Sequence, residues 1–332
     1  MTNNKTSSQD FSTKQPTESF DDYALRLYQN RNTYGYSHRY IASLLNRESG
    51  QSKGESAWRK FYAGFIRGVN YSAEKQTVGQ KRILALSDFH FPFALPVSTF
   101  SQYVGTETLV LNGDILDCQS ISSFPKLYRV PIMEEMIGVR NYLIDLITLI
   151  QPKEVHITVG NHEHRLGKYL ATRMDTDVIE LMPDTSLDYI VTDGFYHYDK
   201  RLGIKTWYEP ITSVFKNTVI HFDGDWKCKV GKTIFCHPLT FSSSIMKTTE
   251  KAVNHFFRTE SDFDAVVLGH THKLGFYPQG NVALYEMGTC SDVSQLDYMN
   301  GKLTDPQQSG FLLLIQNEDG SINTNETKLI KL

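Results

Sequence analysis

Five short polar motifs follow one another along the chain, and their residue types are those that bind metal ions. They are Asp88-Phe89-His90, Gly113-Asp114-Ile115-Leu116-Asp117, Gly160-Asn161-His162-Glu163, Cys236-His237-Pro238 and Gly269-His270-Thr271-His272. A mixture of carboxylate, amide and imidazole groups without thiolates suits manganese, iron or zinc better than calcium. Together the motifs supply enough ligands for two divalent metal ions.

Each motif directly follows a short apolar run that is typical of a buried strand. These runs are residues 83–86, 109–111, 155–159, 233–235 and 265–268. In open α/β sheets, ligands bind at the loops that follow the carboxyl ends of the strands. The sequence therefore predicts that the polar groups of all five motifs converge at one edge of a sheet.

The apolar runs alternate with helical patterns, which indicates a parallel or mixed sheet. A strong helix is predicted over 132–150, ended by Pro152. Later strands at 282–287 and 311–315 are predicted to close a second sheet. We therefore expect an α/β fold, a two-sheet sandwich flanked by helices, in a large domain that spans residues 79–332.

Residues 176–232 break this alternation and are rich in aromatic side chains, so we interpret them as an insertion near the edge of the site. Tyr198, Trp207 and Tyr208 could stack on a nucleobase, because every base offers a π-face. They could equally cover a small core within the insertion itself.

The N-terminal part differs from the rest in composition and charge. Residues 1–19 are polar and predict a disordered tail, and residues 20–78 predict a small all-helical unit of three helices, similar to a helix-turn-helix. Residues 31–82 contain ten Lys or Arg and three Glu, a local charge of +7, so the remainder of this chain of net charge −3 carries −10. The basic residues on or near the third helix, which could contact nucleic acid, are Lys53, Arg59, Lys60 and Arg67. The unit could instead serve oligomerisation or packing.

The composition indicates the cellular compartment of the protein and the redox state of its cysteines. No stretch approaches the roughly 20 apolar residues that span a bilayer, and the polar N-terminus lacks a signal-peptide core, so we expect a cytoplasmic protein without a membrane partner. The cysteines form no Cys-x-x-Cys pair, which predicts reduced thiols and no disulfide framework; they are Cys118, Cys228, Cys236 and Cys290.

The ordered motifs over residues 83–272 resemble the calcineurin-like metallophosphoesterase superfamily, and the helical extension before them resembles phage and bacterial members. The resemblance implies seven metal ligands: Asp88, His90 and His272 on one ion, Asn161, His237 and His270 on the other, and Asp114 bridging both. It also implies that His162 faces the leaving group and that Asp117 orients it. Cys118 stands where the protein serine/threonine phosphatases have an arginine, which argues against a protein phosphatase.

Two cations roughly 3.5 to 4 Å apart can clamp a phosphoryl group and lower the pKa of a bridging water, so metal-bound hydroxide is the expected nucleophile. His162 is the expected general acid, because its pKa lies near neutrality and Asp117 can favour the charged ring. Arg165 could bind a substrate phosphate through its planar fork, or it could pair with a surface acid.

We therefore predict a phosphoesterase that depends on two divalent ions, with manganese favoured and iron or zinc as alternatives. Its expected substrate is a phosphodiester in a nucleotide or nucleic acid. A phosphomonoesterase acting on small molecules and a DNA-binding protein with structural metals remain the alternatives.

Overall fold

The computed structural model describes residues 12–15, 18–31, 34–62, 80–123, 129–182, 185–296 and 306–332. It separates into two compact units, residues 1–78 and residues 79–332, and each is described by itself. Most of the expected tail and Arg67 of the third predicted helix lie outside the described residues.

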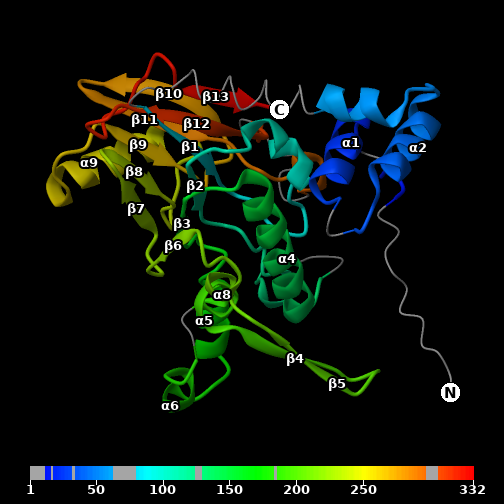
Figure 1. Cartoon of the computed structure of the whole chain (residues 1–332). Helices are drawn as coiled ribbons and strands as arrows, with labels where there is room; N and C mark the ends of the chain where they lie inside the picture. The colour runs from blue at the N-terminus through cyan, green and yellow to red at the C-terminus, as the bar shows by residue number, and fades with distance from the viewer. Residues whose placement is uncertain are drawn as a thin grey trace. The chain divides into compact units, whose positions relative to one another are not determined.

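The N-terminal unit is helical and has a hydrophobic core of its own. It contains α1 (Phe20–Gln29), α2 (His38–Ser49) and a further helical stretch over residues 55–62 (Figure 1). Ser19 and Ser37 each accept a hydrogen bond from the backbone N–H three residues later, which starts α1 and α2. The core is built from all three stretches: Tyr23, Ala24, Leu27, Ile41, Ala42, Leu44, Leu45, Trp58 and Tyr62.

The expectation of a disordered tail over 1–19 is wrong for the part of it that the structure describes. Ser12 is buried, and its carbonyl oxygen accepts a hydrogen bond from the Tyr23 hydroxyl. Glu18 forms an ion pair with Arg26 at 2.7 Å. Polar composition alone did not reveal these contacts, because they depend on Tyr23 and Arg26 of the first helix.

In the large unit, two sheets pack face to face. The first sheet has the order β13-β12-β1-β2-β3-β6, with strands β1 (Lys81–Leu86), β2 (Thr108–Asn112), β3 (Glu154–Thr158), β6 (Val219–Phe222), β12 (Gly310–Gln316) and β13 (Lys328–Lys331). The second has the order β10-β11-β9-β8-β7, with strands β7 (Lys227–Val230), β8 (Thr233–Cys236), β9 (Ala265–Leu268), β10 (Leu274–Gln279) and β11 (Val282–Met287). Alternate side chains of the two sheets meet between them, among them Ile83, Val110, Phe235, Val267 and Leu312.

Helices cover the outer face of each sheet, as Figure 1 shows. The apolar face of α4 (Ile132–Ile150) packs on the first sheet, and that of α9 (Lys247–Thr259) packs on the second. The helix predicted over 132–150 matches α4, which ends where Gln151 adopts a left-handed backbone before Pro152. The α/β sandwich flanked by helices is therefore confirmed. The remaining short helices are η1 (Val97–Tyr103), η2 (Gln119–Ile121), α5 (Arg165–Ala171), α6 (Thr176–Ile179), α7 (Ser186–Asp188), η3 (Tyr189–Asp193), α8 (Ile211–Val214) and η4 (Val293–Gln295).

Two expectations about strands are wrong. The strand predicted at 311–315 is β12, which pairs antiparallel with β1 in the first sheet instead of closing the second. The insertion predicted over 176–232 ends earlier, because β6 pairs with β3 and β7 pairs with β8 in the two main sheets. What projects from the body is a two-stranded hairpin of β4 (Phe195–Asp199) and β5 (Ile204–Tyr208) (Figure 1).

Candidate metal centre

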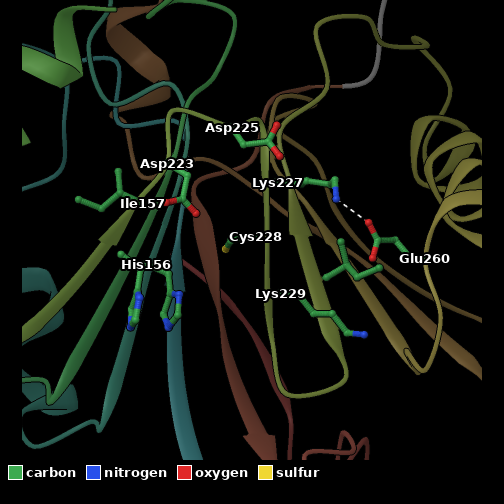
Figure 2. Close-up of a pocket in the computed structure, with 10 residues that line it drawn as sticks. His156, Ile157, Asp223, Asp225, Lys227, Cys228, Lys229 and Glu260 are labelled. Atoms are coloured by element: carbon green, nitrogen blue, oxygen red, sulfur yellow. Dashed lines mark hydrogen bonds and ion pairs between the residues drawn. The ribbon is translucent and has the colours of Figure 1, made fainter.

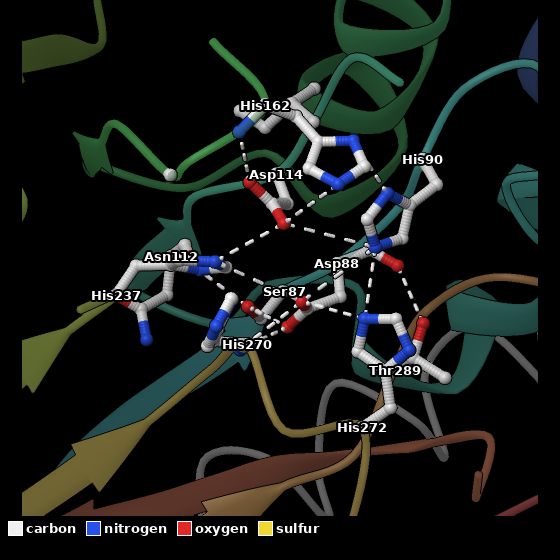
Figure 3. Close-up of polar contacts among 12 residues, drawn as sticks. Ser87, Asp88, His90, Asn112, Asp114, His162, His237, His270, His272 and Thr289 are labelled. Atoms are coloured by element: carbon white, nitrogen blue, oxygen red, sulfur yellow. Dashed lines mark hydrogen bonds and ion pairs between the residues drawn. The ribbon is translucent and has the colours of Figure 1, made fainter. Parts of the chain in front are cut away.

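The loops that follow β1, β2, β3, β8 and β9 meet at one end of the sandwich and bring the five polar motifs together (Figure 3). Three groups of side chains there have ligand atoms that all lie within 4.8 Å of one another. They are Asp88 with His90 and His272, Asp114 with His237 and His270, and His90 with Asp117 and His162. Six of the seven ligands implied by the resemblance belong to the first two groups.

In the first group, three buried side chains face one another closely. His272 Nε2 lies 3.0 Å from Asp88 Oδ1 and 2.9 Å from His90 Nε2. Both Asp88 oxygens also accept the backbone N–H of His270, at 3.1 and 2.9 Å. The backbone of one motif thus fixes the carboxylate of another.

Both histidines of the second group have a buried ring nitrogen without a hydrogen-bond partner, His237 Nε2 and His270 Nε2. The side-chain oxygen of Asn161, a ligand that the resemblance implies, is also buried and unpartnered. The Asn112 carbonyl oxygen lies 2.7 Å from His237 Nδ1, and a carbonyl can only accept, so Nδ1 carries the proton. In the neutral ring, Nε2 directs a lone pair at Asp114 Oδ2, 3.3 Å away. Two acceptors facing each other in a buried site fit a cation between them, either a metal ion or the proton that Asp114 favours on His237.

Asp114 lies between the two groups. Its Oδ2 atom is 3.3 Å from His237 Nε2, 3.8 Å from His162 Nε2 and 3.9 Å from His90 Nε2. Its Oδ1 atom accepts the backbone N–H of His162 at 2.9 Å. Held by that bond, the carboxylate has one oxygen at the centre of the cluster, as a bridging ligand requires.

The backbone at these positions is unusual. Five of the seven implied ligands have a left-handed φ, between 45° and 78°: Asp88, His90, Asp114, His270 and His272. Such angles are uncommon outside glycine and gather at functional sites. Gly160 allows the close approach, because a Cβ there would lie 2.2 Å from Asp114 Oδ1. The glycine before Asn161 is therefore required for the packing of the two loops.

The electrostatics of the site fit bound cations. Burial disfavours the charged forms, but the imidazoles His237 and His272 outweigh it and hold the pKa of Asp88 well below its usual range. In turn, carboxylates outweigh burial and raise the pKa of His90 to about 10 and that of His237 to about 9. Ionised carboxylates in so buried a place attract positive charge, from protonated imidazoles or from divalent ions.

His162 lies beside the cluster and is connected to Asp117 and Arg165. Its Nδ1 atom is 3.0 Å from Asp117 Oδ1, and its Nε2 atom is 2.9 Å from Arg165 Nη2. A guanidinium can only donate, so the ring accepts at Nε2 and its proton is on Nδ1, toward Asp117. Arg165 also donates from Nη1 to the Asp117 carbonyl oxygen at 2.6 Å. Arg165 Nη1 also lies 3.6 Å from Asp117 Oδ1, so the acid beside the arginine is a buried one and not the surface acid considered from the sequence.

The expectation that His162 has a pKa near neutrality, with its charged form favoured, is wrong for this arrangement. Burial, His90 and Arg165 lower the pKa of His162 to about 4, and they outweigh Asp114 and Asp117. The sequence did not reveal this, because the proximity of Arg165 depends on how α5 begins at that residue. Moving Arg165 away from Nε2 would raise the pKa of the ring.

Several supporting residues were not predicted from the sequence. Glu163 is fully buried and accepts backbone N–H groups from Asp114, Ile115, Leu116 and Gly160 at 2.7–3.0 Å. Its place in the Gly-Asn-His-Glu motif was the only signal for it. Others hold the ligands through single bonds that no local pattern encodes: Ser87 to the Asp88 side chain, Thr289 to the Asp88 carbonyl and Asn112 to His237.

A polar cavity of about 460 Å³ lies elsewhere, between β3 and β6 on one side and β7 on the other (Figure 2). The rings of His156 and His221 stack in it with centroids 4.3 Å apart, opposite the Lys227–Glu260 ion pair. None of the seven implied metal ligands lines this cavity. His156 and His221 thus lie outside the three groups of possible metal ligands.

The fold and the site define a calcineurin-like phosphoesterase. The chain belongs to this family, whose sequence profile matches residues 81–274, more than half of the chain. Members of the family are metal-dependent phosphoesterases, and the clustered ligands agree with divalent metal binding. In the part of the chain that the structure describes, no helix has the length and apolarity needed to cross a membrane.

The N-terminal unit has a different relative. Residues 8–77 match the profile of the YonJ N-terminal domain. A curated relative is the SPbeta prophage-derived uncharacterized protein YonJ of Bacillus subtilis (strain 168), 36% identical over 69 residues. That match covers 21% of this chain and only 17% of the relative.

Among solved structures, the chain is similar to three that share 13–16% of its sequence. A novel archaeal phosphodiesterase matches with a TM-score of 0.36, covering 76% of this chain and 99% of that one. Vacuolar Protein Sorting 29 from Cryptosporidium parvum matches at 0.36, with 76% and 98% covered. A metallophosphoesterase from Sphaerobacter thermophilus matches at 0.34, with 76% and 88% covered.

Proposed function

We propose that this phosphoesterase hydrolyses a phosphodiester in a nucleotide or nucleic acid, with two divalent ions held by the seven residues named above. The observation that carries the proposal is the position of Asp114 Oδ2, which lies within 3.9 Å of imidazole nitrogens from three different motifs. The unpartnered nitrogens of His237 and His270 support a second ion beside the first. Imidazole and oxygen ligands suit manganese, with iron or zinc as alternatives.

Two ions bound there would supply an activated water and would neutralise charge on the phosphoryl group. The chain's own residues would then handle the leaving group. We propose that His162 donates a proton from Nε2 to the departing oxygen, while Asp117 keeps the ring oriented through Nδ1.

Arg165 must change partner for this proton transfer to occur. In the structure its guanidinium donates to His162 Nε2, the same atom that would carry the proton. A substrate phosphate is a better acceptor for a planar guanidinium than a neutral imidazole is. We propose that the phosphate takes over Arg165, which binds the substrate and frees His162 Nε2 for the proton.

Two observations support a phosphodiester as the substrate. Exposed basic side chains, including Arg59 and Lys60, lie on the helical stretch 55–62 and suit a polyanion. Cys118 is buried and replaces the arginine expected in enzymes that act on phosphoproteins.

A comparison of two chromogenic substrates tests the proposal. With manganese added, we expect faster hydrolysis of bis(p-nitrophenyl) phosphate than of p-nitrophenyl phosphate. The reverse order would favour the phosphomonoesterase. If neither is hydrolysed by protein that metal analysis shows to hold two ions per chain, the DNA-binding alternative with structural metals replaces the proposal.

A further inference from the structure

We infer that the β4–β5 hairpin is a stacking platform for single-stranded nucleic acid, formed by Tyr196, Tyr198 and Trp207 with Lys205. This inference rests on the proposed function for its link to catalysis, and it narrows the substrate from nucleotides in general to a strand long enough to reach the hairpin. The hairpin stands out from the sandwich in Figure 1.

The pairing of the two strands places these four side chains on one face. Tyr196 lies opposite Trp207, and Tyr198 lies opposite Lys205. Directly paired residues point to the same side of an antiparallel ribbon. Tyr196 and Tyr198 are each 56% exposed and Trp207 is 46% exposed, so their rings are accessible. We call this side the platform face.

The opposite face of the hairpin has a different role. Phe195 is buried in the main core, and its ring stacks on Tyr208 with centroids 5.2 Å apart. Arg140 of α4 covers Tyr208 and donates from Nε to the Glu209 carbonyl at 2.7 Å. Tyr208 therefore serves packing, whereas Tyr198 and Trp207 are available for a ligand.

Close contacts hold the side chains of the platform face in place. Gly194 has a φ of 74°, and a Cβ there would lie 2.5 Å from the Trp207 ring, so the indole lies directly against the backbone. Tyr196 contacts Trp207 with ring centroids 4.6 Å apart, and Lys205 Nζ lies 4.1 Å from the centroid of the Tyr196 ring. Rings held in place in this way lose little freedom when a base stacks on them.

The positive charges around the platform face favour a nucleic acid over a second copy of this chain as its partner. Lys205 lies on the platform face, and Lys200 and Arg201 are exposed at the tip. The one acid there, Asp199, is on the opposite face, where its carboxylate accepts the backbone N–H groups of Arg201 and Leu202. Two copies meeting through this face would bring like charges together, whereas a strand of nucleic acid offers bases to the rings and phosphates to the cations.

Binding of a fluorescein-labelled oligothymidylate of about 20 nucleotides tests the inference by fluorescence anisotropy, with the full-length protein. The combined change Tyr198→Ala and Trp207→Ala should weaken binding at least about tenfold, and Tyr198→Phe with Trp207→Phe should retain binding because the rings remain. Ile204→Ala is the matched control, since Ile204 is exposed on the opposite face. It should bind as the wild type does.

Lys205→Glu provides a second variant, which keeps the aromatic residues. It should lower affinity, and it should make the dependence of log affinity on log salt shallower by about 0.7, as expected when one phosphate contact is lost. Ile204→Ala, which lies outside the platform face, should hydrolyse bis(p-nitrophenyl) phosphate at the wild-type rate.

Three results would overturn the inference. These are wild-type affinity in the double alanine variant, an equal loss in Ile204→Ala, or a change of oligomeric mass by light scattering in the platform variants, which would make the face a contact between copies. Failure of the proposed function would instead appear as absent hydrolysis by the wild-type protein, whatever the oligonucleotide affinities are.

Discussion

The proposed metal ligands and the proposed proton donor should respond differently to mutation. Replacing Asp114 removes the oxygen that faces three imidazoles, so Asp114→Ala should lose at least one metal ion per chain, measured by elemental analysis after purification without chelator. His162→Ala should keep the metal and lower turnover by about 10²- to 10⁴-fold, the usual contribution of a general acid.

The leaving group distinguishes this role of His162 from general damage to the site. p-Nitrophenolate departs without a proton, whereas an alkoxide needs one, so His162→Ala should slow an alkyl diester much more than a p-nitrophenyl diester. Equal losses on both substrates, or full turnover in the variant, would contradict a proton-donating role.

Arg165 gives a prediction about pH. The positive charge beside His162 lowers the pKa of that ring, so its removal in Arg165→Met should raise the pKa. Because a general acid acts only while it is protonated, the limb on which kcat/KM falls with rising pH should move to higher pH, by up to about one unit. The matched control is Lys168→Met, which removes the same charge from an exposed position of α5. A shift to lower pH, or an equal shift in both variants, would refute the assignment.

At the residue level, the sequence predicted what ordered motifs encode and missed what depends on distant neighbours. Six of the seven expected ligands lie in groups whose ligand atoms are within 4.8 Å of one another, because each follows a strand whose position in the sheet is fixed. The low pKa of His162 could not be foreseen, since it depends on burial and on the position of Arg165. Thr289 reaches the Asp88 carbonyl from a part of the chain about 200 residues away, and no pattern links them.

At the level of elements, Glu163 joins the loop after β2 to the loop after β3. Its buried carboxylate accepts four backbone N–H groups, and Glu163→Ala would leave those donors unsatisfied. We expect the free energy of unfolding, measured by urea denaturation, to fall by at least about 3 kcal/mol, while Glu163→Gln should cost less because one oxygen remains. Metal content should fall too, since the carboxylate fixes the loop that carries Asp114.

A surface glutamate serves as the control for Glu163. Glu154 pairs with Lys81 at 2.9 Å with 38% of its side chain exposed, and exposed pairs contribute little. Glu154→Ala should therefore cost less than about 1 kcal/mol. Similar losses in the two variants would mean that Glu163 does not act as the connection between the loops.

The strands that were not predicted from the sequence were missed for one physical reason. The central strands β1, β2, β3, β8 and β9 were predicted because burial on both faces leaves nearly continuous apolar runs. The edge strands β6, β7, β10 and β13 are short or half exposed, so their side chains carry no such signal. β12 was recognised as a strand but placed in the wrong sheet, because pairing with β1 depends on the whole topology rather than on local pattern.

At the scale of the whole molecule, the two units carry different chemistry. Among the described residues, all three groups of possible metal ligands lie in the unit 79–332, whereas the basic stretch 55–62 belongs to the unit 1–78. Trp58 and Tyr62 pack into the core of the N-terminal unit itself, so they are not available to dock that unit elsewhere. Arg59, which pairs with Glu55 at 3.8 Å, and Lys60 are exposed on the same helix, where the proposed contact with nucleic acid would be made.

Separating the two units should therefore lower the affinity for nucleic acid while leaving hydrolysis of a small substrate intact. Deletion of residues 1–78 should leave hydrolysis of bis(p-nitrophenyl) phosphate close to the wild-type rate, because every implied ligand is retained. Its affinity for nucleic acid in a filter-binding assay should fall at least about tenfold at low salt and less at high salt, since the lost contacts are electrostatic. In the full chain, Arg59→Ala with Lys60→Ala should reproduce part of that loss without disturbing the core. Unaltered affinity at both salt concentrations would assign the N-terminal unit to oligomerisation or packing, and substrate selection would then lie with the large unit alone.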